Sequence, residues 1–305
     1  MALVPFDNRD GWIWLDGHFV PWRDANLHIL SHAMHYSSAV FEGERMYDGA
    51  IFELEAHTRR LFRSAEILDF QLPYSEAEIN AASTEVCRRN GFTDCYVRPI
   101  AWRGAEQMGV SALHSNTHVA IAAWEWPKYF DANKLRRGIR LRWATYCRPP
   151  ASAAPTAAKA AGLYMICTIE KNAAERLGFD DSLMLDSEGN IAETTGANIF
   201  FIRGGAIYTP TPDCFLDGIT RRTVIEIARA QGRQVIETRI RPEDLATFSE
   251  CFVTGTAAEV TPVGQVGEQI YTPSDITFDL MERYGALVRL GAGDTCKMEL
   301  AIANR

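Results

Sequence analysis

A single lysine, Lys159, stands among small apolar residues in the stretch "PTAAKAAGLYM", residues 155–165. Apolar surroundings take water away from an amine and favour its neutral form. A neutral amine attacks carbonyl carbons, so a lysine in this setting suits Schiff-base chemistry with aldehydes and ketones. Small residues are also frequent in loops, and the stretch taken alone favours a lysine on a surface loop. Evidence from the other polar residues of the chain is needed to choose between the two interpretations.

A carboxylate, Glu193, is a second candidate, because it lies between strand-like segments in "GNIAETTGANIFFI" with apolar residues on both sides. A carboxylate among apolar neighbours requires a partner. One functional partner is the protonated ring nitrogen of a pyridinium compound. The alternative is a turn in which water solvates the glutamate, and the local sequence alone favours this alternative.

Two turns that contain glycine and threonine are candidates for binding an anion. In "DGITRRTVIEIARAQG", Gly218 precedes Thr220, and we expect this threonine to cap a helix. Free backbone N–H groups and the dipole at a helix start attract a phosphate. We expect the second turn, "TGTAAEV" at 254–260, to present a group of backbone donors. Each turn is a weak indication alone, and the two in one domain are a stronger one.

Arg60 lies near the margin of the apolar stripe of a helix that the periodicity predicts over residues 57–70. Arg59 and Arg63 point away from this stripe into water. Of the three arginines, Arg60 is therefore the best placed to reach inward to an anion. The alternative is a side chain that extends along the edge of a packed core with its charge in water.

The strand-like segment "CYVRPIAW" places Tyr96 and Arg98 on one face, because side chains alternate along a strand. In the next segment, "HVAIAAWEW", Trp124 and Trp126 also share a face. Aromatic walls with one arginine would form a pocket that accepts both an apolar group and an anion. An ordinary aromatic core is the alternative interpretation.

Three histidines, His28, His32 and His35, follow the spacing of one helix face, which is compatible with a metal site. No acidic residue falls in register on that face, and the cysteines form no ligand cluster. We therefore favour packed histidines that hydrogen-bond to the backbone, and we expect no metal.

Composition narrows the class of protein. A formal charge of −8 favours neither nucleic acid nor an anionic membrane as a partner, and no apolar run is long enough to span a bilayer. Seven scattered cysteines without a C-x-x-C pair argue against a disulfide framework and a zinc site. The first residues lack a signal-peptide pattern. We expect a reduced, cytoplasmic protein.

The order of predicted elements indicates an α+β fold in two domains. Hairpin strands alternate with helices, and no regular βαβ repeat is apparent. A polar, charged segment after Pro127 marks the boundary, so we expect a small domain over 1–130, a linker at 131–135 and a larger domain over 136–305. Besides 57–70, helices are predicted at about 75–90, 164–177, 220–232 and 276–290.

Taken in order, these motifs resemble the branched-chain amino acid aminotransferases of the fold-type IV, pyridoxal 5′-phosphate (PLP) dependent family, which also contains D-amino-acid aminotransferases. The resemblance spans nearly the whole chain. It rests on "HYSSAVFEGERMY", "EAHTRRLFRSAEIL", "CYVRPIAWRGAEQMGV", "PTAAKAAGLY", "IAETTGANIFFI", "LDGITRRTV" and "TGTAAEVTPV". It implies a two-domain fold with PLP in the cleft between the domains.

The resemblance also implies a role for each motif residue. Lys159 would hold PLP covalently and carry the proton between the substrate Cα and the cofactor, and Glu193 would keep the pyridine nitrogen protonated. The other cofactor-binding residues would be Arg60, Tyr164, Ile219, Thr220 and Thr256. The substrate-binding residues would be Tyr36, Phe41, Tyr96, Arg98, Trp126, Tyr129, Thr256 and Ala257.

The implied reaction is a ping-pong transfer of the amino group of L-leucine, L-isoleucine or L-valine to 2-oxoglutarate, carried out by a homodimer. Within the fold, the alternatives are a D-amino-acid transaminase, an (R)-amine transaminase and a 4-amino-4-deoxychorismate lyase. A metal-dependent hydrolase that uses the three histidines is the alternative from another class. The chain departs from the family pattern at Leu163, Thr194 and Ala197, where the family commonly has Asn, Gly and Glu.

Overall fold

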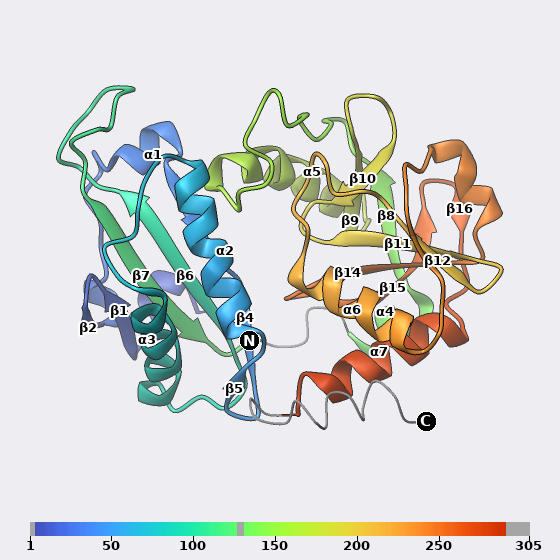
Figure 1. The fold of residues 1–305 in the computed structure, drawn as a ribbon, viewed down its shortest axis with the longest axis horizontal. Coiled ribbons are helices and arrows are strands. Elements are labelled where there is room, and N and C mark those ends of the chain that lie inside the picture. The colour runs from blue at the N-terminus through green and yellow to red at the C-terminus, as the bar shows by residue number, and fades with distance from the viewer. Residues whose placement is uncertain (1–3, 127–130, 291–305) are drawn as a thin grey trace. The chain divides into compact units, whose positions relative to one another are not determined.

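The computed structural model describes residues 4–126 and 131–290, and the chain divides into two compact units (Figure 1). The first unit comprises Met1–Pro127 together with the short segment Ala158–Gly162. The second comprises Lys128–Ala157 and Leu163–Arg305. The predicted boundary assigned Ala158–Gly162 to the second domain, whereas this segment packs with the first unit. Lys159 belongs to this segment.

The first unit is built on an antiparallel sheet of seven strands in the described residues, with the order β2-β1-β7-β6-β4-β5 and β3 paired to β6. The strands are β1 (Trp12–Leu15), β2 (His18–Pro21), β3 (Ala39–Phe41), β4 (Glu44–Tyr47), β5 (Ala50–Ile51), β6 (Cys95–Arg103) and β7 (Thr117–Trp124). The last two are the segments predicted from their alternation. Their pairing places Tyr96 opposite Trp124.

A break between β3 and β4 has a local cause. Both strands pair with β6, which contains Pro99. Proline has no N–H to donate to a neighbouring strand. The regular pairing with β6 is interrupted at Glu42 and Gly43. Across this interruption, Glu42 N still donates to Pro99 O at 2.8 Å. A side chain at Gly43 would clash, because its Cβ would lie 2.0 Å from Tyr96 Oη. The break therefore fixes the course of the chain beside Phe41.

Helices α2 (Leu54–Ile67) and α3 (Glu76–Arg89) cover one face of this sheet, and α1 (His32–Tyr36) packs near β6. The predicted α2 lacked its first turn. Helix α3 begins where predicted, at a capping box formed by Ser75 and Glu78. The core between helices and sheet contains Leu61, Ala65, Ile79, Val86, Val97 and Ile121.

In the second unit, six strands form a closed circuit, because β10 pairs with both β9 and β11 in the order β10-β9-β8-β15-β14-β11. Strands β12, β13 and β16 extend it. The strands are β8 (Ile139–Trp143), β9 (Asp181–Leu185), β10 (Ile191–Thr194), β11 (Asn198–Arg203), β12 (Ala206–Thr209), β13 (Val235–Glu237), β14 (Glu250–Gly255), β15 (Glu259–Val266) and β16 (Gln269–Ile270). Parallel pairs β8–β9 and β12–β13 are each joined by a helix, so two local βαβ units occur within the predicted α+β pattern.

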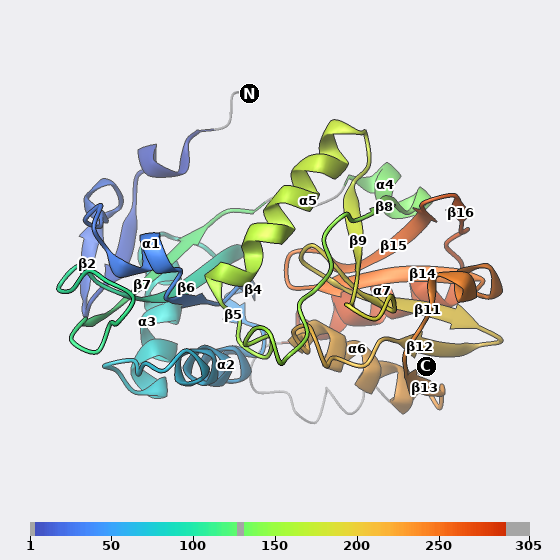
Figure 2. The same cartoon turned by 90° about the horizontal axis from the view of Figure 1, so that it is seen from above.

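Helices pack around this circuit: α5 against β9 (Figure 2), α6 against β14, and α4 and α7 against β15. Their bounds are α4 (Ala132–Arg137), α5 (Tyr164–Arg176), α6 (Ile219–Ala230) and α7 (Asp275–Leu287). Short 3₁₀ turns lie at Phe6–Asn8, Trp22–Asp24, Ala161–Leu163 and Pro242–Thr247. Among the described residues, no helix is long and apolar enough to cross a membrane.

Candidate active site

The backbone of Lys159 is fixed on two sides within the first unit. Its N–H donates to Ser64 Oγ of α2 at 3.0 Å, and its carbonyl accepts from Phe41 N of β3 at 3.1 Å. Val40 and Ala160 form an antiparallel bridge next to it. Both alanines that flank Lys159 are buried, and Lys159 itself is half-buried. The small neighbours therefore let the segment lie against β3, and the surface-loop interpretation does not fit.

Lys159 and Arg98 both lie beside the aromatic ring of Phe41. Lys159 Nζ lies 4.9 Å from the ring centroid of Phe41, and Arg98 Cζ lies 4.8 Å from it. Tyr96 and Trp124 continue the aromatic surface around Arg98, at 5.3 and 5.9 Å from its Cζ. The strand does place Tyr96 and Arg98 together, as its alternation predicted.

Arg98 keeps unused hydrogen-bonding capacity inside this aromatic cluster. Its Nη2 donates to Tyr96 Oη at 3.2 Å. Its Nε is buried and has no hydrogen-bond partner in the described part of the chain. A buried donor without a partner is costly and suits an anionic ligand. Trp126 completes the cluster, with its ring centroid 5.0 Å from that of Tyr96.

Arg60 reaches inward from α2, as expected, while Arg59 and Arg63 are exposed. Its Nε and Nη2 donate to the two carboxylate oxygens of Glu42 at 2.6 and 2.7 Å. His57, one turn earlier on the helix, donates from Nδ1 to Glu42 Oε2 at 2.7 Å. Neither Glu42 nor His57 was predicted from the sequence to contribute to the site.

Glu42 and His57 differ in charge. Burial alone would raise the pKa of Glu42, but Arg60 and His57 hold that pKa well below its usual range, so Glu42 is a carboxylate. Burial lowers the pKa of His57, which is therefore a neutral imidazole. Arg60 is thus a guanidinium oriented by a buried anion.

Glu193 on β10 is nearly buried in the second unit. Its Oε1 lies 3.3 Å from Arg148 Nε, an ion pair without the geometry of a hydrogen bond, and its Oε2 accepts from Asn198 Nδ2 at 3.2 Å. Arg148 is also buried. The water-solvated interpretation of Glu193 is therefore wrong. Arg148 was missed because no local pattern relates it to Glu193.

The predicted anion site at "DGITRR" is the start of α6. The expectation that Thr220 caps this helix is wrong: the N-cap is Gly218, without a side-chain cap, and Thr220 is buried in the first turn after Ile219. The first backbone bond of the helix is Arg222 N to Gly218 O. The N–H groups of Ile219 and Thr220 therefore precede the first intrahelical bond, the position from which helices bind anions.

The second predicted anion site is the tight turn between β14 and β15. Gly255 pairs with Glu259 across it, which leaves Thr256, Ala257 and Ala258 in the turn. Glu259 has a φ of 52°. Thr256 and Ala257 are half-buried. The predicted turn is thus present, next to the buried end of β14.

Three predicted residues remain: one lies in each unit, and one lies outside the described residues. Tyr36 ends α1 in the first unit and is 42% exposed, with its ring against His32. Tyr164 begins α5 in the second unit. Tyr129 lies outside the described residues.

All three histidines hydrogen-bond to the backbone, as favoured above, but only His32 is packed, since His28 and His35 are exposed. His32 is buried, accepts from Ser38 Oγ and donates to Gly109 O at 3.0 Å. His35 donates to Ile29 O, and His28 accepts from Leu30 N. Over residues 4–126 and 131–290, no group of three or more His, Cys, Asp or Glu is arranged to hold a metal ion.

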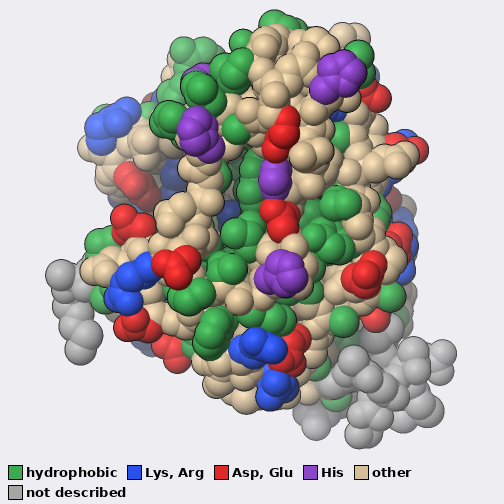
Figure 3. All heavy atoms as spheres, turned by 90° about the vertical axis from the view of Figure 1, so that its left-hand side faces the viewer, with side chains coloured by type: hydrophobic (Ala, Val, Ile, Leu, Met, Phe, Trp, Pro, Cys, Tyr) green, Lys and Arg blue, Asp and Glu red, His purple; other side chains and the backbone are tan. Residues whose placement is uncertain are grey.

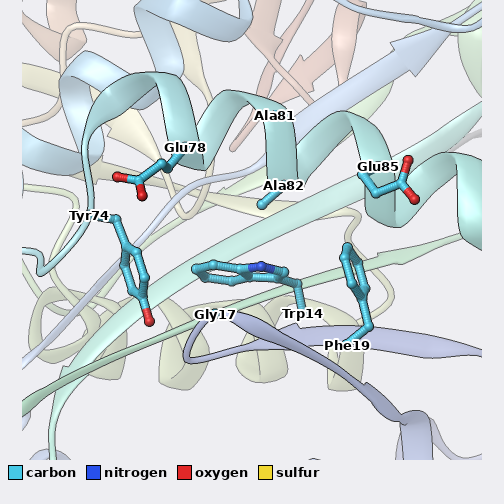
Figure 4. A pocket seen from close by; sticks show the side chains of 8 residues that line it. All are labelled: Trp14, Gly17, Phe19, Tyr74, Glu78, Ala81, Ala82 and Glu85. Carbon is cyan, nitrogen blue, oxygen red and sulfur yellow. The ribbon is translucent and has the colours of Figure 1, made fainter.

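A surface pocket of about 340 Å³ lies between α3 and the β1–β2 hairpin (Figure 4). Trp14, Phe19 and Tyr74 form its aromatic walls, and Glu78 and Glu85 lie above them. None of the predicted site residues lines it. Its carboxylates already bind Ser75 and Arg88, so the pocket is separate from the candidate site.

Comparisons with known proteins agree on one family. Residues 39–266 match the model of the family described as amino-transferase class IV. A Pseudomonas aeruginosa branched-chain-amino-acid aminotransferase is 44% identical over 263 residues, which cover 85% of this chain and 86% of that protein.

Two solved structures of the T.th. branched-chain amino acid aminotransferase are similar in fold. The one with N-(5′-phosphopyridoxyl)-L-glutamate gives a TM-score of 0.89, and the one with 4-methylvaleric acid gives 0.88. Each is 39% identical and covers 94% of this chain and 96% of its own. The chain therefore belongs to the class IV aminotransferases and, among them, to the family of the branched-chain-amino-acid aminotransferases.

Proposed function

We propose that this protein is a PLP-dependent transaminase that moves the amino group of L-leucine, L-isoleucine or L-valine to 2-oxoglutarate in two half-reactions. Family membership supports the reaction type. The ligands of the two T.th. structures support both substrates, because one contains L-glutamate and the other has the carbon skeleton of leucine without its amino group.

The chemistry of the predicted residues suits each functional group of PLP. The carboxylate of Glu193 suits the pyridine nitrogen, and the N–H groups of Ile219 and Thr220 with the Arg60 guanidinium suit the phosphate. Lys159 supplies the amine for the aldehyde. Tyr164 would donate to the phenolic oxygen, and Thr256 would add a phosphate contact. When bound, PLP supplies an electron sink for the carbanion that forms at the substrate Cα.

Lys159 is the proposed proton carrier. Its Nζ would take the proton from the substrate Cα and return it at the cofactor carbon, as a positioned general base and acid. The two backbone bonds of Lys159, to Ser64 and Phe41, support this role, because they fix the origin of the side chain. The side chain then moves without displacing the segment that carries it.

Glu193 would hold a proton on the pyridine nitrogen. This requires an anionic carboxylate, and two contacts favour the anion: the Arg148 ion pair and the Asn198 amide donor. Arg148 would also restrain the carboxylate, since a guanidinium at 3.3 Å competes with the ring nitrogen for it.

One observation carries the substrate assignment: Arg98 has a buried Nε without a partner among the described residues, inside an aromatic cluster. The aromatic rings of Phe41, Tyr96 and Trp126 suit a branched apolar side chain. The Arg98 donors suit the side-chain carboxylate of glutamate and 2-oxoglutarate. Tyr36 and Tyr129 would extend this pocket, and the turn at Thr256 and Ala257 would bind the substrate α-carboxylate.

The test is a panel of L- and D-amino acids, each mixed with PLP-loaded enzyme and followed by the loss of the visible absorbance of the cofactor. We expect L-leucine, L-isoleucine, L-valine and L-glutamate to react. Rapid reaction of D-alanine without reaction of L-leucine would instead establish a D-amino-acid transaminase.

We also propose a homodimer. Residues 27–36 and residues 104–113 of the first unit contact each other, because His32 donates to the carbonyl oxygens of Gly104 and Gly109. Both segments expose large apolar side chains. These are Leu27, Ile29, Leu30, Met34, Tyr36, Met108, Val110 and Leu113. Figure 3 shows a face of this unit on which hydrophobic side chains lie among histidines. Monomers rarely expose a large apolar patch, so a second copy would cover it. Sedimentation should give a dimer that Val110→Lys dissociates, and a wild-type monomer would contradict the proposal.

The cytoplasm is the proposed location. The described cysteines are all free: Cys87, Cys95, Cys147, Cys167, Cys214 and Cys251. Free thiols are typical of reducing compartments. Cell fractionation should recover the protein with cytoplasmic markers, and recovery in an oxidising compartment would contradict this assignment.

A further inference from the structure

The side chain of Asn198 bonds to two parts of the second unit, the Glu193 carboxylate and the loop that leads into α6. The proposed function assigns these two parts to opposite ends of PLP. Asn198 begins β11 and is 5% exposed. Its Nδ2 donates to Glu193 Oε2 at 3.2 Å and to Leu216 O at 3.0 Å. Its Oδ1 accepts from Gly218 N at 3.2 Å. All polar atoms of this amide are therefore engaged, by one residue of β10 and two residues of the loop before α6.

The contact to Glu193 is set by strand pairing. Glu193 and Asn198 are register partners in the antiparallel pair β10–β11. Their side chains therefore lie on the same side of the pair, and the distance between them is fixed by the backbone. The amide donor also faces the carboxylate oxygen that does not pair with Arg148.

The contacts to Leu216 and Gly218 fix the start of α6. Gly218 is the N-cap, and its N–H is bound by Asn198 instead of by a capping side chain of its own helix. A larger residue does not fit, because a Cβ at Gly218 would lie 2.3 Å from Asn198 Oδ1. The close approach of the two residues thus depends on glycine, and it holds the N–H groups of Ile219 and Thr220 in one orientation.

We propose that Asn198 is a positioning residue that sets the spacing between the Glu193 carboxylate and the phosphate-binding start of α6. This inference rests on the proposed function. PLP is rigid between its ring nitrogen and the atom that bears the phosphate arm, so both ends are bound well only when their two receptors are correctly spaced. One amide that bonds to both receptors couples them directly.

The role predicts a specific effect on binding. Removing the amide should leave each receptor able to bind its own end of the ligand, but not both ends at once. Pyridoxal, which lacks the phosphate, reports the ring end alone. The gain in affinity from the phosphate is the ratio of the Kd of pyridoxal to the Kd of PLP, and this ratio measures the coupling.

The experiment compares wild type with Asn198→Leu, which keeps the approximate size and removes all three hydrogen bonds. Asn190→Leu is the matched control, since Asn190 is also buried in this unit and bonds to a carboxylate, that of Asp186 at 2.7 Å, outside the proposed site. Thermal unfolding verifies that each variant folds. Asn198→Ser gives the same comparison if the leucine variant does not fold.

We expect the ratio to fall at least tenfold in the Asn198 variants and to stay at the wild-type value in Asn190→Leu. An unchanged ratio, with PLP and pyridoxal weakened equally, would overturn the positioning role and leave a role at the ring end only. Wild-type protein that binds no PLP would refute the proposed function itself, so the two failures are distinguishable.

Discussion

Arg60 and Glu42 form a two-point ion pair, with Nε and Nη2 of the arginine 2.6 and 2.7 Å from the two carboxylate oxygens. Glu42 is fully buried, whereas the Arg60 side chain is 13% exposed. The pair holds the guanidinium in one plane, on the helix face that also carries Ser64, the partner of Lys159. A residue proposed to bind phosphate is thus oriented from the protein interior.

Glu42→Gln should destabilise the protein by about 3 kcal/mol, because it leaves the Arg60 charge largely buried without its counter-ion. The measurement is urea unfolding at neutral pH. Glu66→Gln on the same helix is the control, since Glu66 pairs with Arg63 on the surface, where such pairs contribute about 0–1 kcal/mol. Equal effects of the two substitutions would contradict the importance of the buried pair.

The same pair predicts a direction for the dependence of stability on pH. The folded pKa of Glu42 is depressed, so its contribution is present above the unfolded pKa of about 4.5 and is lost as the pH falls further. Wild type should lose stability on acidification more steeply than Glu42→Gln. Parallel curves for the two proteins would show that Glu42 has the same pKa in both states.

Glu44 is predicted to destabilise the fold at neutral pH. It is fully buried, and neither carboxylate oxygen has a hydrogen-bond partner among the described residues. Burial, and then the charge of Glu42, raise the pKa of Glu44 well above 4.5. A raised folded pKa gives stability that is complete below about 4.5 and declines as the pH rises.

Glu44→Leu removes this acid at similar size and should increase the free energy of unfolding at pH 8 by about 1–3 kcal/mol. The gain should shrink toward pH 4.5, where Glu44 is protonated in the folded state and half-protonated in the unfolded state. Urea unfolding at both pH values measures it. A loss of stability at pH 8 would contradict this prediction and would indicate that Glu44 has a stabilising hydrogen-bond partner in the folded protein.

Arg98→Met should separate the two half-reactions. A hydrogen bond to a charged group contributes about 1.5–3 kcal/mol, so the half-reaction with L-glutamate should slow roughly 10- to 100-fold in kcat/KM. The half-reaction with L-leucine should change much less, because its side chain would contact only the aromatic surface. Single-turnover kinetics with each amino acid test this, and equal losses would place Arg98 outside the side-chain pocket.

Local patterns in the sequence were sufficient for the elements and for single site residues. The alternation of β6 placed Tyr96 and Arg98 on one face, and the helical period separated Arg60 from Arg59 and Arg63. Both depend on residues a few positions apart, where geometry is fixed by the element itself.

Partners distant in the chain were not predictable in this way. The Glu42–Arg60 pair depends on a strand break opposite Pro99. The Arg148–Glu193 pair depends on β9, because Arg148 N donates to Leu185 O of that strand and β10 pairs with it. The prediction that Thr220 is the N-cap of α6 failed for a related reason. The N-cap is Gly218, and its N–H donates to Asn198, a residue of β11 that is distant in the sequence. The segment at 158–162 joins the first unit through contacts that no local period reveals.

Lys159 is the residue proposed to hold PLP covalently. Borohydride reduction of the PLP-loaded protein, followed by digestion and mass spectrometry, makes this link permanent and locates it. We expect one phosphopyridoxyl group, on the peptide that contains Lys159, and none on Lys128, Lys134, Lys171 or Lys297. Modification of another lysine with Lys159 unmodified, or PLP lost entirely after reduction, would contradict it.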